Sequence, residues 1–195
     1  DPRDGVADLG MSRVVKHEDE HGALSVALGL DHRADADVQR TEHASDLRAQ
    51  GAVVVVSAGN ASIDVESFSP ANCGGVITVG ATGNTGERAS YSNFGPRVDL
   101  SAPGGDGDDE TSLIVSTYAY GSTTPGDPAY AIAAGTSFSA PLVSGTVSLM
   151  LARNPTLTAG RVLSILQGTT REFPLGTQCR AGSLCGAGLL DAGAA

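Results

Sequence analysis

The run AVVVVS at residues 52–57 constrains the fold of this chain more than any other feature. Its four consecutive valines are β-branched and place apolar side chains on both sides of an extended chain, and the run is too short for a helix. Such a strand is buried on both faces, which is typical of a parallel sheet covered by helices. GVITVGA at 75–81 has the same character, while 98–101 and 112–117 indicate further strands. The sequence therefore predicts an α/β fold with a mainly parallel sheet.

Three helices are expected around this sheet. The segment before the first strand predicts a helix that begins near Asp35 or Asp37 and ends at Gly51. Residues 137–153 are apolar nearly all round, so we expect a helix buried in the centre of the domain. A further helix is expected at about 158–168.

Size and charge limit the classes of protein that this chain can belong to. Its 195 residues fit one domain, 1–195, with a core of its own. The formal net charge is −10, so the basic surface of a nucleic-acid-binding protein is absent. No window reaches the roughly 18 apolar residues of a membrane span. The chain opens on DPRDG, without an initiator Met or a signal peptide, so we expect a trimmed protein or a piece of one.

The three cysteines form an odd set. Cys179 and Cys185 lie close together, whereas Cys73 stands more than a hundred positions earlier. A disulfide between the near pair would close a small loop and stabilise the fold by roughly 2 kcal/mol, and the leftover cysteine suggests a missing partner. The alternative is three reduced, buried thiols. We favour the oxidising, extracellular setting.

The acidic, glycine-rich segment GGDGDDETS at 104–112 has two interpretations. Its carboxylates could hold a calcium ion, although the spacing fits no standard calcium loop. The alternative is a solvated surface loop, which is the commoner role of such segments. A calcium site is therefore an open expectation, and any other metal is unknown.

GTSFSAP at 135–141 places Ser137 where a buried helix begins. A serine there is most often a helix cap. Gly135 allows close backbone approach, however, and the first N–H groups of the helix can bind a developing anion, which suits an acyl-transfer nucleophile. Asn60, directly after a buried strand, could supply a second oxyanion donor, although taken alone it would be a turn residue.

These motifs resemble those of one enzyme family. GTSFSAP resembles the GTS-x-[AS]-P nucleophile motif of the subtilisin-like serine proteases, and VVVVSAGN resembles the strand of their oxyanion asparagine. SPANCGGVITVGAT, RASYSNFGPRVDLSAPG and NPTLTAGRVLSIL follow in the family's order, and the resemblance, which is to secreted bacterial members in particular, is dense from about 52 to 191. It implies a three-layer subtilisin-like fold, with 24–191 matching the C-terminal portion of the catalytic domain and 1–23 matching poorly.

The resemblance implies a serine endopeptidase acting on peptide or protein substrates, with no cofactor required for the chemistry. Ser137 would be the nucleophile, and Asn60 with the Ser137 N–H would bind the oxyanion. VALGL at 26–30 resembles the family's SLG pocket strand, with Ala27 in place of the serine. The substrate-binding residues implied are Leu28, Gly29, Ala58, Gly59, Gly135 and Thr136.

The family's aspartate and histidine motifs, D-[ST]-G and HGTHVAG, do not occur here in recognisable form. The nearest candidates are Asp8 and His21, which otherwise are a loop carboxylate and a surface imidazole. The missing N-terminal portion of the catalytic domain could be a partner. The alternative function is a non-catalytic, protease-derived fragment or peptide-binding module without a complete triad.

Two covalent details also follow from the resemblance. Cys179 and Cys185 are expected to pair, while Cys73 stays single because its family-like partner would lie in sequence that is absent or altered. The Ser69–Pro70 peptide bond is expected to be cis.

We predict that the isolated 195-residue chain has little or no peptidase activity, because no residue at family spacing can accept the proton of Ser137. The measurement is turnover of a chromogenic peptide by the purified chain beside its Ser137→Ala and His21→Ala variants. Robust turnover that both substitutions abolish would contradict this prediction and identify His21 as the general base.

Overall fold

The fold was analysed in a computed structural model of the chain. It describes residues 11–18, 24–30, 44, 46–107, 110–120, 124, 126–182 and 184–195. Of the helix predicted before the first strand, Ala44 and residues 46–49 are helical, and the helix ends before Gly51, which has a left-handed φ of 92°. The expected start at Asp35 or Asp37 lies outside the described residues.

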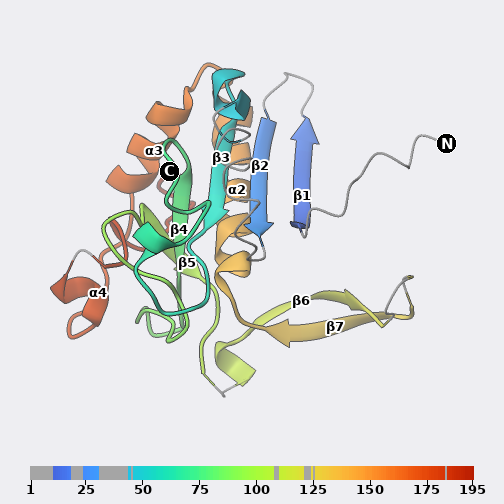
Figure 1. Ribbon diagram of the computed structural model, residues 1–195, viewed down its shortest axis with the longest axis vertical. Helices are drawn as coiled ribbons and strands as arrows, with labels where there is room; N and C mark the ends of the chain where they lie inside the picture. Colours follow the sequence, from blue (N-terminus) through green and yellow to red (C-terminus); the bar gives the residue numbers. More distant parts are fainter. Residues whose placement is uncertain are drawn as a thin grey trace.

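A mainly parallel sheet forms the middle of the molecule (Figure 1). Its strand order is β1-β2-β3-β4-β5. β2, β3, β4 and β5 run parallel, and β1 lies antiparallel to β2 at one edge. The predicted strands at 52–57, 75–81 and 98–101 are confirmed. The strand bounds are β1 Met11–Glu18, β2 Leu24–Leu30, β3 Val53–Ser57, β4 Ile77–Thr82 and β5 Leu100–Pro103.

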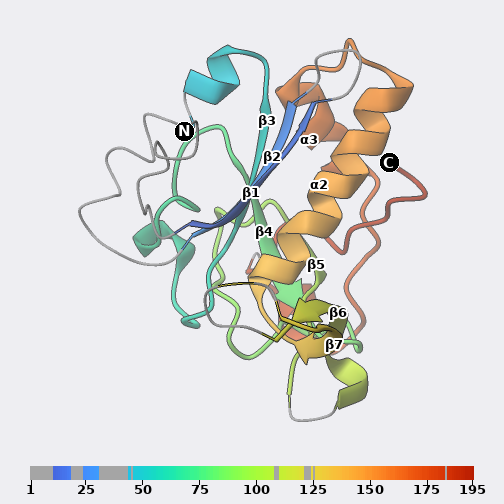
Figure 2. The same ribbon diagram turned by 90° about the vertical axis from the view of Figure 1, so that its right-hand side faces the viewer.

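Strand β3 separates two apolar clusters. Val53 and Val55 point into the larger cluster, which contains residues from β4, β5 and the helices. Val54 and Val56 point the opposite way, into a cluster with Val65 and Phe68. Successive side chains of any extended strand point to opposite faces of the sheet, and in β3 the side chains on both faces are apolar. The result is the predicted three-layer α/β arrangement, which Figure 2 shows with the sheet nearly edge-on.

The predicted helices at 137–153 and about 158–168 are confirmed as α2 (Thr136–Arg153) and α3 (Ala159–Gly168), and both pack on one face of the sheet. Thr158 caps α3 by accepting a hydrogen bond from the backbone N–H of Arg161. None of the described helices is long and apolar enough to cross a membrane.

The prediction that 137–153 is buried all round was wrong for one face of the helix. Val143 and Val147 are fully buried against the sheet, but Leu142 and Leu149 are 45% and 69% exposed. The physical reason is that α2 packs on strands β2 to β5 with one side only.

The other face of the sheet is covered by short elements and loops. The helical residues 44 and 46–49 belong to this side, where Ala44 packs together with the loop that contains Phe68. The 3₁₀ helix η2 (Val65–Ser67) contributes Val65 to this cluster, whereas η3 (Glu110–Ser112) buries no residue and is not part of it.

The predicted strand at 112–117 lies in a separate hairpin, so its assignment to the main sheet was wrong. Strand β6 (Ile114–Ala119) pairs antiparallel with β7 (Pro128–Ala133), the alanine-rich stretch before GTSFSAP. In Figure 1 this hairpin extends from the body beside the sheet. The physical reason is composition, because Ser116 and Thr117 interrupt the apolar run and the strand is largely exposed.

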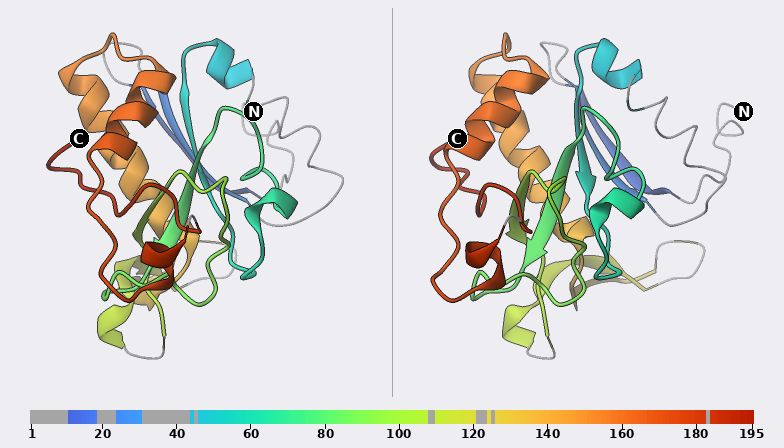
Figure 3. Two further views of the ribbon diagram at one scale, coloured as in Figure 1. Left: turned by 90° about the vertical axis from the view of Figure 1, so that its left-hand side faces the viewer. Right: turned by 60° about the vertical axis from the view of Figure 1, so that its left-hand side comes forward.

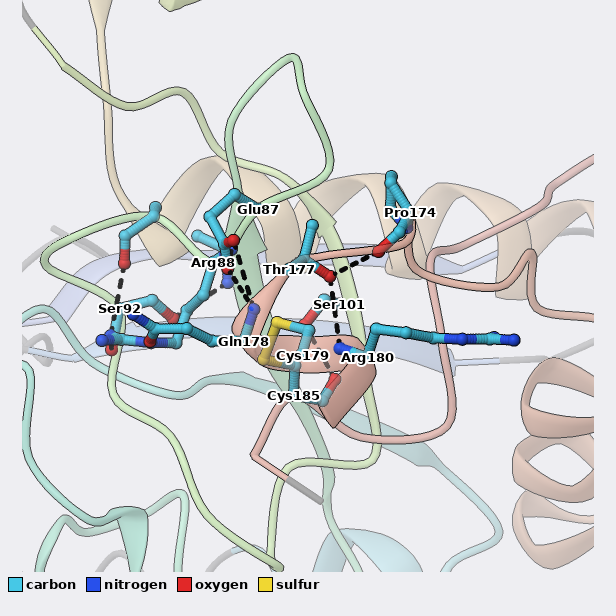
Figure 4. Close-up of a disulfide and its surroundings, with 12 residues drawn as sticks. Glu87, Arg88, Ser92, Ser101, Pro174, Thr177, Gln178, Cys179, Arg180 and Cys185 are labelled. Carbon is cyan, nitrogen blue, oxygen red and sulfur yellow. Dashed lines mark hydrogen bonds between the residues drawn. A yellow bond between two sulfur atoms is a disulfide. The ribbon is translucent and has the colours of Figure 1, made fainter. Parts of the chain in front are cut away.

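The C-terminal segment is fastened to β5. Cys179, in the short helix α4 (Gln178–Ala181), forms the predicted disulfide with Cys185 (Figure 4). The hydroxyl of Ser101 in β5 donates to the carbonyl of Cys185 (2.9 Å). Figure 3 shows this segment running beside β5.

Two further covalent predictions are confirmed. Cys73 is buried and lies outside the disulfide. The Ser69–Pro70 peptide bond is cis.

We predict that Leu100→Ala lowers the free energy of unfolding by about 2–5 kcal/mol, because Leu100 is fully buried between β4 and the helices. Leu175→Ala is the matched control, since that side chain is 87% exposed and should change stability by less than about 0.5 kcal/mol. Urea unfolding measures both. Equal effects of the two substitutions would contradict the assigned core.

Candidate active site

Ser137 is the second residue of α2, and its side chain is exposed. The N-cap of the helix is Gly135, and no side chain makes a capping hydrogen bond. The helix-cap interpretation of Ser137 is therefore wrong. Among the described residues none forms a hydrogen bond with the Ser137 hydroxyl, which lies at the positive end of the helix dipole.

Asn60 lies beside the start of α2 with its side-chain amide in a fixed orientation. The Asn60 Oδ1 atom accepts hydrogen bonds from the backbone N–H of Thr136 (2.9 Å) and from its hydroxyl (2.7 Å). A backbone N–H only donates, so the atom facing Thr136 has to be the oxygen of the amide. The Asn60 NH₂ group is therefore directed away from Thr136 and remains a donor.

The absence of a side chain at Gly135 leaves a space between two donors. A Cβ atom added to Gly135 would lie 3.4 Å from Asn60 Nδ2 and 3.8 Å from the backbone nitrogen of Ser137. Both nitrogens therefore lie within 4 Å of one point beside Gly135.

The start of α2 is tied to the end of β5 as well as to the Asn60 loop. The backbone N–H of Gly135 donates to Gly104 O (2.9 Å), and the hydroxyl of buried Ser139 donates to Ala102 O (3.0 Å). Gly104 has no room for a side chain, because a Cβ there would lie 2.5 Å from Ser139 Oγ. These contacts hold the first turn of α2, which contains Ser137, to the end of β5.

Tyr91 is a further component that sequence reasoning missed. Its hydroxyl is shared between the carbonyls of Gly104 (2.9 Å) and Gly105 (2.7 Å). Burial raises the pKa of Tyr91 to about 12; the Gly135 N–H lowers it and the Asp106 charge raises it further. The phenol therefore stays neutral and keeps donating to the segment that follows β5. A tyrosine in a polar loop sequence gives no signal of this contact.

The expected substrate-binding residues lie around this point. Leu28 pairs with Val56 across β2 and β3, so the carboxyl end of β2, including Gly29, lies at the same edge of the sheet as Asn60. Ala58 and Gly59 are buried, as are Gly135 and Thr136. The structure thus gathers these backbones near Ser137, and their contact with a substrate stays a prediction.

Two other expectations lie outside the described residues. Asp8 and His21 are among those not described, and none of the chain's four histidines has a described side chain. No described group of three or more His, Cys, Asp or Glu residues could hold a metal ion. The proposed calcium loop includes Asp108 and Asp109, which are not described either, so calcium stays a prediction.

A cavity of about 300 Å³ lies at the opposite edge of the sheet. It is lined by the first residues of β3 and β4, by the start of α3 and by Arg97 and Asp99. Burial raises the pKa of Asp99, while hydrogen bonding from Thr78 and the charge of Arg97 lower it. This cavity is separate from the site at Ser137.

Sequence comparison finds matches to known proteases. A sequence profile described as the subtilase family matches residues 11–188. An extracellular protease of Xanthomonas campestris pv. campestris is 46% identical over 147 residues, covering 75% of this chain and 23% of that protein. An extracellular basic protease of Dichelobacter nodosus is 38% identical over 149 residues, covering 74% of this chain and 23% of that protein.

Comparison with solved structures also finds proteases. A protease from Pseudoalteromonas arctica superposes with a TM-score of 0.72 at 38% identity, covering 79% of this chain and 44% of that one. A cold-adapted subtilisin-like serine proteinase superposes with a TM-score of 0.59 at 27% identity, covering 76% of this chain and 48% of that one. The chain thus spans about a quarter of the length of the curated relatives it matches and less than half of these solved chains.

We predict that Tyr91 makes stability fall as pH rises from 10 to 12. In that range the unfolded chain ionises this phenol while the folded chain keeps it neutral, so raising pH favours the unfolded state. Tyr91→Phe removes the contribution of this phenol to the pH dependence of stability. The measurement is urea unfolding at several pH values, with Tyr130→Phe, at an exposed position, as the control. Equal pH slopes for Tyr91→Phe and the unsubstituted chain would contradict the prediction.

Proposed function

This chain belongs to the subtilase family, and on that premise we propose that it carries the nucleophile of a serine endopeptidase that cleaves peptide bonds through an acyl-enzyme on Ser137. The observation that supports this most is the exposed Ser137 at the start of α2, next to an asparagine amide held in one orientation by Thr136. That arrangement is what acyl transfer requires of a nucleophile and an oxyanion donor.

In the proposed reaction, the Ser137 Oγ atom forms a bond to the carbonyl carbon of the substrate while a histidine takes the hydroxyl proton. The same proton passes to the leaving amine as the C–N bond breaks, which leaves an ester on Ser137. A water molecule then attacks this ester, its proton goes to the histidine, and the acid product leaves with Ser137 restored.

The negative oxygen of the tetrahedral intermediate would be bound by Asn60 Nδ2 and the Ser137 backbone N–H. These are the two donors that border the space left by Gly135. Removal of one such donor costs about 10²–10³-fold in kcat, a value known from subtilisin, a member of this family. Asn60 is therefore a proposed catalytic residue.

The histidine would be His21 with Asp8 as its aspartate partner, or both residues would come from a remaining N-terminal portion of the catalytic domain. The second source is favoured by the coverage, since this chain spans about a quarter of its curated relatives. The same coverage favours the second candidate function, in which the chain is a protease-derived fragment or peptide-binding module without turnover.

The proposed setting is extracellular, because relatives at 46% and 38% identity are named extracellular proteases. The disulfide between Cys179 and Cys185 fits an oxidising environment. The proposed substrates are peptides or proteins. The proposed chemistry needs no cofactor.

We predict that a fluorophosphonate probe labels Ser137 stoichiometrically in a protein that joins this chain to the histidine and aspartate of the catalytic domain, because labelling requires a working base and an oxyanion site. Asn60→Ala should slow labelling by about 10²-fold or more, whereas Ser137→Ala should abolish it. Mass spectrometry of the digested protein locates the label, and Ser144→Ala, on the same helix, is the matched control. Absence of labelling in protein whose fold is intact would favour the non-catalytic module.

A further inference from the structure

Asn93 is a buried asparagine that binds the loop carrying Asn60 at four points, on both sides of Asn60. Its side chain is 1% exposed. The Asn93 Nδ2 group donates to Ala58 O (2.8 Å), and the Asn93 backbone N–H donates to Gly59 O (2.9 Å). The Asn93 Oδ1 atom accepts hydrogen bonds from the backbone N–H groups of Ala61 (3.0 Å) and Ile63 (3.1 Å).

The chemistry of these contacts specifies an amide. The loop offers Asn93 a carbonyl, which only accepts, and two N–H groups, which only donate. A carboxylate would lack the donor for Ala58, and a hydrocarbon side chain would satisfy none of the three groups. Because a buried carbonyl without a donor is costly, Ala58 O in particular favours an amide at this position.

The loop also closes tightly on this amide. Gly59 has a left-handed φ of 100°, and a Cβ atom added to it would lie 2.5 Å from Asn93 Nδ2. The residue before Asn60 is thus in direct contact with the Asn93 side chain. Any displacement of Asn93 would move the backbone from which the Asn60 side chain projects.

Asn93 is itself fixed to the sheet through Ser92. The buried Ser92 hydroxyl accepts a hydrogen bond from the backbone N–H of Ala81 in β4 (3.0 Å) and donates to Asn93 O (3.0 Å). Strand β4 therefore holds Ser92, Ser92 holds Asn93, and Asn93 holds the loop of Asn60.

We propose that Asn93 is a positioning residue that sets the place of the Asn60 amide for oxyanion binding, an inference that rests on the proposed function. Asn93 is buried and touches no substrate, so it acts only through Asn60. Its removal lets the loop shift and loosens the hydrogen bonds between Asn60 and Thr136.

The first test uses this chain without any requirement for activity. Amide hydrogen exchange of Thr136 reports directly on the loop, because the Thr136 N–H donates to Asn60 Oδ1. Asn93→Ala should speed this exchange at least about tenfold more than it speeds exchange of Val147 inside α2, since the three side-chain hydrogen bonds of Asn93 to the loop are lost. Equal acceleration at both amides would overturn the proposal.

Thr78→Val is the matched control. Thr78 is also 1% exposed, and its hydroxyl donates one buried hydrogen bond to Ala71 O (2.8 Å), away from the Asn60 loop. This variant should accelerate exchange of Thr136 and Val147 by the same factor. A selective effect on Thr136 in the control would show that any core defect loosens the loop and would overturn the assignment to Asn93.

Asn93→Asp keeps the shape of the side chain and adds a pH signature. Below the pKa of the introduced carboxyl, which burial raises, the protonated acid can donate to Ala58 O and Thr136 protection should return. Above that pKa, protection should be lost. If Asn93→Ala fails to fold, Asn93→Asp still tests the proposal. Thr136 protection that does not change with pH in that variant would overturn it.

The second test uses the active protease in a double-mutant cycle. Asn93→Ala should lower kcat by about 10–100-fold with KM changed less than about threefold, and should have less than about a threefold effect when Asn60 is already alanine. Full additivity of the two substitutions would overturn the proposal. If a protein that also carries the histidine and aspartate shows no turnover, the proposed function fails, and the exchange experiment still decides whether Asn93 holds Asn60.

Discussion

The burial of β3 on both faces is the constraint from which the rest of the structure follows. Four valines in succession leave no side of the strand for water, so each face has to be covered by a separate layer. Parallel neighbours then bring the carboxyl ends of the strands to one edge, where Asn60 follows β3 and Gly104 follows β5. Helix α2 begins at that same edge, and this brings Ser137 to Asn60.

At this edge of the sheet, buried side chains hold the exposed residues of the candidate site in place. Ser137 and Asn60 face solvent, whereas Thr136, Ser139 and Asn93 are buried and bonded to backbone or to Asn60. A site on loops gains rigidity when buried hydrogen bonds replace the freedom of the chain. The helix start is fixed on one side by the loop after β3 and on the other by the end of β5.

The sequence predicted those parts of the fold in which the residue types themselves indicate burial, a helix or a disulfide. The doubly apolar strands, the two long helices and the near cysteine pair are of this kind, and the structure confirms them. It did not predict that 112–117 leaves the sheet, because six mixed residues look alike in a hairpin and at a sheet edge. The roles of Tyr91 and Asn93 were missed for another reason, since both depend on backbone groups brought close only by the complete fold.

The uncovered side of α2 has a consequence for the colloidal behaviour of this chain. Leu142 and Leu149 lie two helical turns apart and are both exposed, so one side of α2 presents two large apolar side chains to water. At neutral pH the net charge of −10 keeps separate copies apart. Near the isoelectric point of about 4.6, protonated carboxylates cancel that repulsion, and salt screens it at neutral pH, so apolar contact between these side chains of separate copies is then least opposed.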